Sequence, residues 1–252
     1  MKNKIALVTG GSRGLGKDMA LSLAKKGIDV ILTYHTKKEE AEQVVAEIIQ
    51  LDRKATALQL DVSDTSSFNA FLASIKEILK SNWEAETFDY LINNAGTGAT
   101  ISIADVTEEV FDNLINIHYK GAYFLTQKSM PMINDNGAVI FISSGTTRFS
   151  VPGYSVYSSM KAALEIFTKH VAREYGKRGI RSNIVAPGPI ETDFNNAAIR
   201  SNPERKNFLA SMSPLNRVGQ ADDIGGVVAF LCSDDARWIN GQRIEVSGGI
   251  NL

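Results

Sequence analysis

The sequence predicts an α/β protein built on one doubly wound parallel sheet, and two observations carry this prediction. Short continuous apolar runs alternate with longer segments of helical periodicity along the 252 residues. Apolar runs without polar alternation are typical of strands that helices cover on both faces. A repeated strand–helix–strand order predicts right-handed crossovers. We therefore expect about seven strands, with helices on both faces of the sheet.

The predicted elements follow one another in a regular order. The strands are expected at Ile5–Val8, Val30–Leu32, Ala55–Leu60, Tyr90–Ile92, Ala138–Ile142, Ile184–Ala186 and Ile244–Val246. The helices are expected at Leu15–Lys26, Lys37–Leu51, Ser66–Leu79, Glu108–Met130, Ser158–Lys177 and Asp222–Leu231. In the second helix the apolar residues fall on one stripe beside a Lys/Glu face, as an amphipathic surface helix requires.

The chain is interpreted as a single domain, residues 1–252, because no linker rich in Pro, Gly or Ser divides it. Two stretches lack regular periodicity. Asn82–Thr87 is predicted to be a polar surface connector. Pro187–Pro214 has no strand character and is interpreted as a lid or substrate-binding loop region, with a mobile surface loop as the alternative.

Charge and cysteine content exclude several classes of protein. With 27 Lys+Arg and 28 Asp+Glu, the net charge of −1 argues against a nucleic-acid or anionic-membrane partner. The lone Cys232 excludes an intramolecular disulfide and a thiolate zinc cage. No metal site is predicted, because His35, His118 and His170 have no carboxylate at ligand spacing. No apolar run reaches the roughly 18 residues of a membrane span, and we predict a cytoplasmic protein.

A glycine-rich loop, Thr9–Gly16, follows the first predicted strand and opens the first helix. Glycines let a backbone turn sharply and let a pyrophosphate approach, while the helix N-terminus supplies free N–H groups. The spacing of Gly10, Gly14 and Gly16 differs from the G-x-G-x-x-G fingerprint. The position of the loop between strand and helix nevertheless indicates a dinucleotide site, with a plain tight turn as the alternative.

The residues after the second strand favour NADP(H) over NAD(H). An acid at the end of this strand commonly binds the ribose 2′-hydroxyl of NAD, but Val30–Lys38 contains none. Arg13 lies in the glycine loop, and Lys37 and Lys38 follow the strand. Cations without an acid suit a 2′-phosphate. The two lysines are equally well explained as the solvated start of a helix, so Arg13 is the preferred candidate and NAD(H) stays the alternative.

Tyr157 and Lys161 are four residues apart on a predicted helix, so their side chains share a face. Tyr34 and Lys38 have the same spacing, and spacing alone therefore proves little. Ser144 precedes Tyr157 by 13 residues and follows a strand, at the edge where parallel sheets bind ligands. An ammonium beside a phenol lowers the phenol pKa from about 10. The three residues therefore predict an acid–base site; an amphipathic helix with an incidental Tyr and Lys is the alternative.

Together these motifs resemble those of the short-chain dehydrogenase/reductase family, along essentially the whole chain. The matching segments are Thr9–Gly16, Asp61-Val62, Asn93–Gly96, Asn116, Ser144, Tyr157, Lys161, Pro187-Gly188 with Thr192, Gly241-Gln242 and Val246–Gly249. The resemblance implies a Rossmann-type fold with one dinucleotide-binding and catalytic domain. Within the family the chain is most similar to 3-oxoacyl-carrier-protein-reductase-like bacterial ketoreductases.

The resemblance also implies a reaction, the reduction of a ketone to a secondary alcohol by NADPH. Ser144 would bind the carbonyl oxygen and Tyr157 would donate the proton. Lys161 would lower the Tyr157 pKa and bind the nicotinamide ribose, and Asn116 would hold a water that links Lys161 to solvent. The implied cofactor contacts are Gly10, Ser12, Arg13, Gly14, Leu15, Gly16, Tyr34, His35, Asp61, Val62, Asn93, Ala95, Gly96, Tyr157, Lys161, Pro187, Gly188, Ile190 and Thr192.

Other readings remain open at this point. Related enoyl reductases place six residues between Tyr and Lys, whereas this chain has three, which favours C=O over C=C chemistry. NAD(H)-dependent oxidation of a sugar-like or steroid-like alcohol, or a non-catalytic dinucleotide-binding regulator, are the alternatives. Apolar residues in the predicted loops suggest an apolar carbonyl substrate. The family implies a homotetramer, or a homodimer, in which Trp238 lies at an interface or packs in the core. His118 either lines the crevice or packs within its helix.

Overall fold

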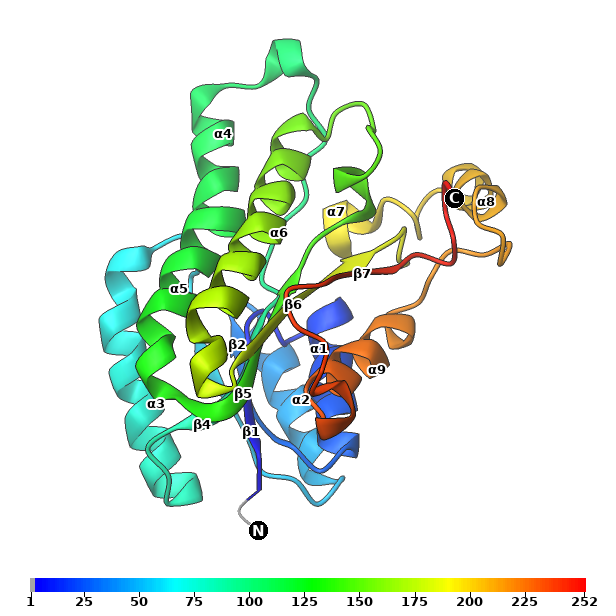
Figure 1. Ribbon diagram of the computed structural model, residues 1–252. Helices are drawn as coiled ribbons and strands as arrows, with labels where there is room; N and C mark the ends of the chain where they lie inside the picture. Colours follow the sequence, from blue (N-terminus) through cyan, green and yellow to red (C-terminus); the bar gives the residue numbers. More distant parts are fainter. Residues whose placement is uncertain (1–2) are drawn as a thin grey trace.

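The computed structural model describes residues 3–252 and contains one sheet of seven parallel strands in the order β3-β2-β1-β4-β5-β6-β7 (Figure 1). The strands are β1 (Ile5–Val8), β2 (Asp29–Tyr34), β3 (Ala55–Gln59), β4 (Phe88–Asn93), β5 (Ile133–Ile142), β6 (Arg181–Pro187) and β7 (Arg243–Val246). Every pairing between neighbours is parallel. The predicted doubly wound α/β fold is confirmed.

Helices cover both faces of this sheet (Figure 1). They are α1 (Gly14–Lys25), α2 (Lys38–Ile49), α3 (Phe68–Trp83), α4 (Glu108–Ile115), α5 (Ala122–Ser129), α6 (Ser155–Tyr175), α7 (Phe194–Ala197), α8 (Pro203–Ser211) and α9 (Asp222–Leu231). One core packs α1, α2 and α9 on the sheet, and a second packs α3, α5 and α6 on the opposite face. Within β1, Ala6 and Val8 join the first core while Ile5 and Leu7 join the second. This two-sided burial explains why the inner strands are continuously apolar.

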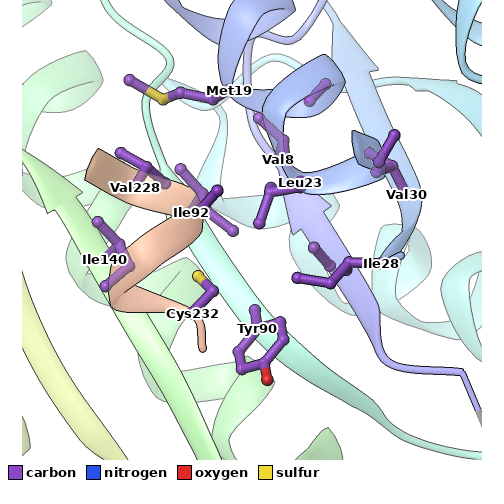
Figure 2. Close-up of a cluster of buried hydrophobic side chains, with 14 of the residues drawn as sticks. Val8, Met19, Leu23, Ile28, Val30, Tyr90, Ile92, Ile140, Val228 and Cys232 are labelled. Carbon is purple, nitrogen blue, oxygen red and sulfur yellow. The ribbon is translucent and has the colours of Figure 1, made fainter. Parts of the chain in front are cut away.

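Figure 2 shows the first of these cores. Met19 and Leu23 of α1 and Val228 of α9 lie with Ile92 of β4, and each of the four is fully buried. Burying one such side chain contributes roughly 1.5–3 kcal/mol, so the core fixes α1 and α9 firmly on the sheet. Cys232 lies in the same core, and its burial raises the pKa of the thiol to about 12. The expected burial of this cysteine is confirmed.

The predicted helix Glu108–Met130 is interrupted by a π-helical segment, Asn116–Gly121, between α4 and α5. A Cβ added at Gly121 would lie 2.1 Å from the Val62 carbonyl oxygen, so only glycine allows this close approach to the loop after β3. Such π-helical insertions occur often at functional sites. Apolar periodicity cannot reveal them, because they add one residue to a turn without breaking the helix.

Several predicted boundaries differ from those in the structure. The connector Asn82–Thr87 begins later, because α3 continues to Trp83, whose indole donates to Asp29 at 2.9 Å. Strand β5 begins at Ile133, five residues before the predicted start at Ala138. Its pairing with β4 shifts register near this end, and the polar residues of the strand lie there. The region 187–214 is not irregular throughout, since Pro187 ends β6 and α7 and α8 lie within it.

Coverage of the strands also differs between the centre and the edges of the sheet. The central strands β1, β2, β4 and β6 are buried almost completely. The edge strands β3 and β7 are only partly buried, because each has a neighbour on one side alone. Trp238 lies just before β7 and is 96% exposed, so its expected alternative of packing in the core is wrong.

Candidate active site

The site lies at the carboxyl ends of β1 and β4, the two neighbours from which the chain winds outward in opposite directions. This switch point is where open α/β sheets bind ligands. The loops after the two strands are tied together. Backbone N–H groups of Asn94 and Ala95 donate to the Thr9 hydroxyl, both at 3.0 Å, and the Asn94 amide donates to the Thr9 and Gly10 carbonyls at 2.9 and 3.1 Å. The sequence analysis did not assign Asn94 a role.

The glycine loop forms a cradle that side chains would block. Gly10 and Gly14 adopt positive φ angles of 66° and 54°, which other residues rarely adopt. A Cβ at Gly16 would lie 2.0 Å from the Gly10 carbonyl oxygen. Helix α1 begins at Gly14, so the free N–H groups of its first turn face this loop. Thr192 lies next to Gly14: a Cβ added to Gly14 would be 3.7 Å from the Thr192 Cβ. These residues fit the pyrophosphate of a dinucleotide.

The loops after β2 and β3 converge on the expected adenosine side. His35 Nε2 lies 3.6 Å from an Asp61 carboxylate oxygen, and Asp61 also accepts hydrogen bonds from Ser63. Arg13 is the N-cap residue of α1. Its half-exposed side chain lies 3.9 Å from the Asp193 carboxylate. A guanidinium in this exposed position can reach a ribose phosphate between the loops.

The two lysines after β2 are engaged locally. Lys37 and Lys38 lie 3.7 and 3.6 Å from Glu40 and Glu42, one helical turn further along α2. Exposed pairs of this kind are typical of a solvated helix face. Arg13, Lys37 and Lys38 each lie near a carboxylate, and the assignment of Arg13 to the cofactor site stays a prediction.

Ser144, Tyr157 and Lys161 come together beside this groove. Helix α6 begins at Ser155, three residues earlier than predicted, so Tyr157 lies in its first turn. Tyr157 and Lys161 are 9% and 5% exposed, and the Lys161 Nζ is 5.6 Å from the centre of the Tyr157 ring. Lys161 donates to the Ile142 carbonyl at 2.8 Å. Ser144 is hydrogen-bonded to Tyr157.

The expected effect of Lys161 on the pKa of Tyr157 was wrong. Burial raises the pKa of Tyr157 above its ordinary value, and the hydrogen bond with Ser144 offsets this only in part. Burial also lowers the pKa of Lys161 to about 8, so part of the lysine is neutral near that pH. Desolvation is the largest cause of both shifts. The phenol stays protonated, which is the state that a proton donor needs.

The structure places His118, rather than Asn116, against Tyr157. The two rings meet edge to face, 5.1 Å apart at 87°. Asn116 opens the π-helical segment, and its side chain has no hydrogen bond within residues 3–252. The role of Asn116 in holding a water stays a prediction. The sequence analysis mentioned His118 but favoured helix packing.

The side chain of Asn93 is engaged within the fold, and its expected contact with the cofactor stays a prediction. It is buried at the end of β4, and its amide donates to the Thr126 hydroxyl of α5 at 3.0 Å. The side chain therefore joins the strand to the helix behind it. Two residues further along, the Ala95 backbone faces Gly10, and a Cβ at Gly10 would lie 3.0 Å from the Ala95 Cα. Ala95 thus borders the cradle.

A carboxylate that the sequence analysis missed supports the Ser144 segment. One Glu165 carboxylate oxygen accepts from the hydroxyls of Ser143 and Thr147, at 2.5 and 2.7 Å, and from Arg243 at 2.8 Å. Arg243 also donates to the Ser144 carbonyl at 3.3 Å. Glu165 continues the helical face of Tyr157 and Lys161 at a further four residues, and this spacing is the signal that could have revealed it.

Close backbone contacts fix the course of the chain directly after β6. The Gly188 N–H donates to the Val246 carbonyl at 3.0 Å, and a Cβ at Gly188 would lie 2.8 Å from the Ser247 Cα. Ile190 then forms a bridge with Gly219. These contacts direct the following residues toward the glycine loop.

Two further aromatic side chains lie close to Tyr157. The rings of Tyr154 and Phe194 lie 6.0 and 6.1 Å from the ring of Tyr157. The Asn195 amide donates to the Tyr154 hydroxyl at 3.2 Å and to the Thr100 hydroxyl at 3.1 Å. The α7 segment therefore lies over Tyr157, in the region that the sequence analysis interpreted as a substrate-binding loop.

A glycine cradle beside a Ser–Tyr–Lys cluster, in which the tyrosine and the lysine are buried, indicates an oxidoreductase of the α/β class. The family model described as "Enoyl-(Acyl carrier protein) reductase" matches residues 10–251. A 3-oxoacyl-[acyl-carrier-protein] reductase of Staphylococcus aureus is 39% identical over 251 residues, which cover 99% of this chain and 98% of the relative. The tetrahydroxynaphthalene reductase PfmaG of Pestalotiopsis fici is 35% identical over 257 residues, 98% of this chain and 91% of the relative.

Solved structures give the same result. The angucycline C-6 ketoreductase LanV with bound NADP superposes with a TM-score of 0.93 at 34% identity, over 98% of this chain and 95% of LanV. The chain therefore belongs to the short-chain dehydrogenase/reductase family. Within residues 3–252, none of the helices has the length and apolar character needed to span a membrane.

Proposed function

We propose that this protein reduces a ketone to a secondary alcohol with NADPH, and that Tyr157 donates the proton to the developing alkoxide. One observation carries the proposal. A protonated, buried phenol lies next to a hydroxyl and an amine, at the sheet edge that also bears the glycine cradle. When a ketone accepts a hydride, its oxygen becomes an alkoxide. That oxygen needs a proton donor within hydrogen-bond distance.

The residues present fit NADP(H). Gly10, Gly14 and Gly16 leave room for the pyrophosphate, Thr192 closes over it, and Arg13 would meet the 2′-phosphate. When bound, NADPH supplies the hydride. The similarity to LanV, whose structure contains bound NADP, supports this choice over NAD(H).

The chain's own groups handle the oxygen and the proton. The Ser144 hydroxyl would hold the carbonyl oxygen, and Tyr157 would give up its proton to that oxygen as the charge develops. Lys161, with a pKa near 8, would return a proton to Tyr157 in the same pH range. Glu165 and Arg243 fix the segment that carries Ser144.

The substrate that this site favours is an apolar, ring-containing ketone. The rings of Tyr154 and Phe194 lie close to Tyr157, and offset or edge-to-face packing on such rings favours flat apolar molecules. The similarity to a tetrahydroxynaphthalene reductase supports this class. A carbonyl rather than a C=C substrate is supported by the three residues between Tyr157 and Lys161, despite the enoyl reductase description of the family model.

We also propose that the chain forms a homotetramer or a homodimer. A cavity of about 470 Å³ between α5 and α6 is lined by Tyr123, Phe167 and Tyr175, and Ile166 beside it is 55% exposed. Trp238 projects from the β7 edge. A second copy would cover such apolar surfaces. The single domain, the substrate-binding role of 187–214 and a cytoplasmic location stay predictions from the sequence.

The test is a spectrophotometric screen of NADPH oxidation against four carbonyl classes: aryl ketones such as 1-tetralone, β-keto esters, acyl thioesters and quinones. We expect turnover with ketones, highest with the aryl ketones. Oxidation of alcohols with NAD⁺ but no reduction of any ketone by NADPH would contradict the proposal.

A further inference from the structure

Arg205, in the first turn of α8, is a half-buried cation that has no carboxylate partner within residues 3–252. Its neighbours along the chain differ from it in this respect. Arg200, Lys206 and Arg217 each form an ion pair, at 2.8, 2.8 and 2.6 Å. A partly desolvated guanidinium without a counter-charge is a group that an anion stabilises.

The guanidinium of Arg205 contacts the hydroxyl of Tyr154. Arg205 Nη2 donates to this oxygen at 3.4 Å, and the Asn195 amide donates to it at 3.2 Å. A phenol oxygen has two lone pairs, and these two donors occupy both. The hydroxyl hydrogen of Tyr154 must therefore point elsewhere, and it has no acceptor in the part of the chain that the structure describes.

Tyr154 and Arg205 together offer several hydrogen-bond donors and one positive charge. A guanidinium has five N–H groups, of which Arg205 gives one to Tyr154, and the Tyr154 hydroxyl hydrogen is a further donor. A carboxylate is the complement of such a pair, because its two oxygens only accept hydrogen bonds and carry a negative charge. The planar fork of a guanidinium also matches the planar shape of a carboxylate.

Tyr154 connects Arg205 to the proposed proton donor, Tyr157. The rings of Tyr154 and Tyr157 meet edge to face, 6.0 Å apart at 76°. The ring of Phe194 lies 6.1 Å from that of Tyr157 and is 43% exposed. The apolar body of a ketone whose oxygen lies at Tyr157 would pack on these rings. Its far end would then lie beside the Tyr154 hydroxyl and Arg205.

We propose that Arg205 and the Tyr154 hydroxyl form a subsite for a carboxylate at the far end of an aromatic ketone substrate. The carboxylate replaces the long contact between the two side chains, and both then donate to its oxygens. The substrate class is thus a flat apolar ketone that carries one acidic group. The inference deepens the proposed function, and its kinetic test rests on that function. Its binding test needs no turnover.

The kinetic test compares two ketones that have the same shape and differ in charge. They are 6-acetyl-2-naphthoate and its neutral amide, 6-acetyl-2-naphthamide, each reduced with NADPH. We expect the wild-type kcat/KM to be at least about tenfold higher for the carboxylate, because charge-assisted hydrogen bonds are the stronger ones. The difference should lie in KM, since the acidic group is bound equally before and during hydride transfer. Equal kcat/KM values for the two ketones would overturn the proposal.

Variants of the two residues assign the preference to the subsite. In Arg205→Gln the preference for the carboxylate should fall below about threefold, and Arg205→Lys, which keeps the charge but loses the fork, should retain part of it. Tyr154→Phe removes one donor and should lower the preference by about threefold. Lys206→Gln is the control, because it removes the same charge from the next residue, which pairs with Glu191. A preference that survives in Arg205→Gln, or that Lys206→Gln lowers equally, contradicts the subsite.

The binding test uses the same two ketones in calorimetric titrations, with and without NADP⁺, which has no hydride to deliver. We expect the wild-type protein to bind the carboxylate at least about tenfold more tightly than the amide, and Arg205→Gln to bind both alike. The wild-type preference should shrink as the NaCl concentration rises from about 0.05 to 0.5 M, because salt screens charges that remain in contact with water. A preference that is absent in both conditions, or independent of salt, rules the subsite out.

The failure of the subsite and the failure of the proposed function can be told apart. If the wild-type protein reduces no ketone, the proposed function fails, and the titrations still decide whether Arg205 binds a carboxylate. If the wild-type protein reduces both ketones equally well and Arg205→Gln changes nothing, the proposed function stands and the subsite is wrong.

Discussion

The two halves of the sheet build their parts of the site in different ways. Around β1–β3, the groups that face the cofactor groove are backbone atoms and half-exposed charges, such as the glycine loop and Arg13. Around β4–β6, they are buried side chains, and the pKa of Tyr157, Lys161 and His118 is displaced by burial in each case. In the proposed function, the first half recognises the cofactor through its shape and the second half prepares proton transfer.

This difference has a physical reason. A pyrophosphate is bound by many N–H groups at once, and close approach matters more than any single side chain. Proton transfer depends on one or two groups whose protonation state must be set, and desolvation is the strongest way to displace a pKa. We therefore expect substitutions in the first half to change cofactor binding, and those in the second half to change kcat and its pH dependence.

The largest effect is expected for Gly16→Ala. The new Cβ would lie 2.0 Å from the Gly10 carbonyl oxygen and 2.6 Å from the Asn94 amide, and backbone cannot give way cheaply. We expect loss of measurable NADPH binding by fluorescence titration and a loss of unfolding free energy above about 3 kcal/mol. Gly226→Ala is the control, because nothing lies within 4 Å of its Cβ position in α9. Gly226→Ala should raise the unfolding free energy of the protein by roughly 0.5–1 kcal/mol. If both variants behaved alike, the close packing proposed for the glycine cradle would be contradicted.

Lys161→Met should separate activity from stability. We expect kcat to fall about 10²-fold or more. Because burial lowers the lysine pKa from 10.5 to about 8, the charged form destabilises the folded state at pH 7. Methionine should therefore raise the unfolding free energy there by roughly 1–3 kcal/mol.

The gain in unfolding free energy from Lys161→Met should decrease as the pH rises. Between pH 8 and 10.5 the unfolded wild-type chain binds more protons at this site than the folded one, so wild-type stability rises with pH. The advantage of Lys161→Met should shrink across this window in urea titrations at pH 7, 9 and 10.5. Lys169→Met, on the exposed face of the same helix, is the control. An advantage that is constant with pH would rule out a desolvated amine.

Arg13→Ala tests the cofactor half with a smaller effect. Losing a charge-assisted contact to a 2′-phosphate should lower the ratio of kcat/KM with NADPH to that with NADH by roughly 10–100-fold. Lys38→Ala, which removes a partner of Glu42 on α2, should change this ratio by less than about twofold. The assignment of Arg13 fails if Lys38→Ala has the larger effect, or if the wild-type enzyme prefers NADH.

Sequence patterns captured the first half better than the second. The order of the apolar runs predicted the strands of the sheet. The glycines at positions 10, 14 and 16 could be interpreted because what the loop needs from them is the absence of a side chain. Ser144, Tyr157 and Lys161 were found because their spacing and place after a strand could be seen in one dimension. Their mutual contacts in the structure match that expectation.

What sequence patterns missed depends on three-dimensional context. The direction of the Tyr157 pKa shift was wrong because the extent of burial is not visible in a spacing. The contact of His118 with Tyr157 was not predicted, because a local pattern does not show the π-helical segment that carries His118. Asn94 and Glu165 act through hydrogen bonds across 85 and 78 residues of sequence, which no local pattern contains.

The account depends most on the proton donated by Tyr157, and Tyr157→Phe tests it directly. The variant removes one hydroxyl from a buried ring, and Tyr175→Phe on the same helix is its control. We predict a fall in kcat for ketone reduction of about 10²–10⁴-fold, with NADPH affinity and unfolding free energy close to wild type. Turnover of Tyr157→Phe within about threefold of wild type, with the fold intact, would contradict the account.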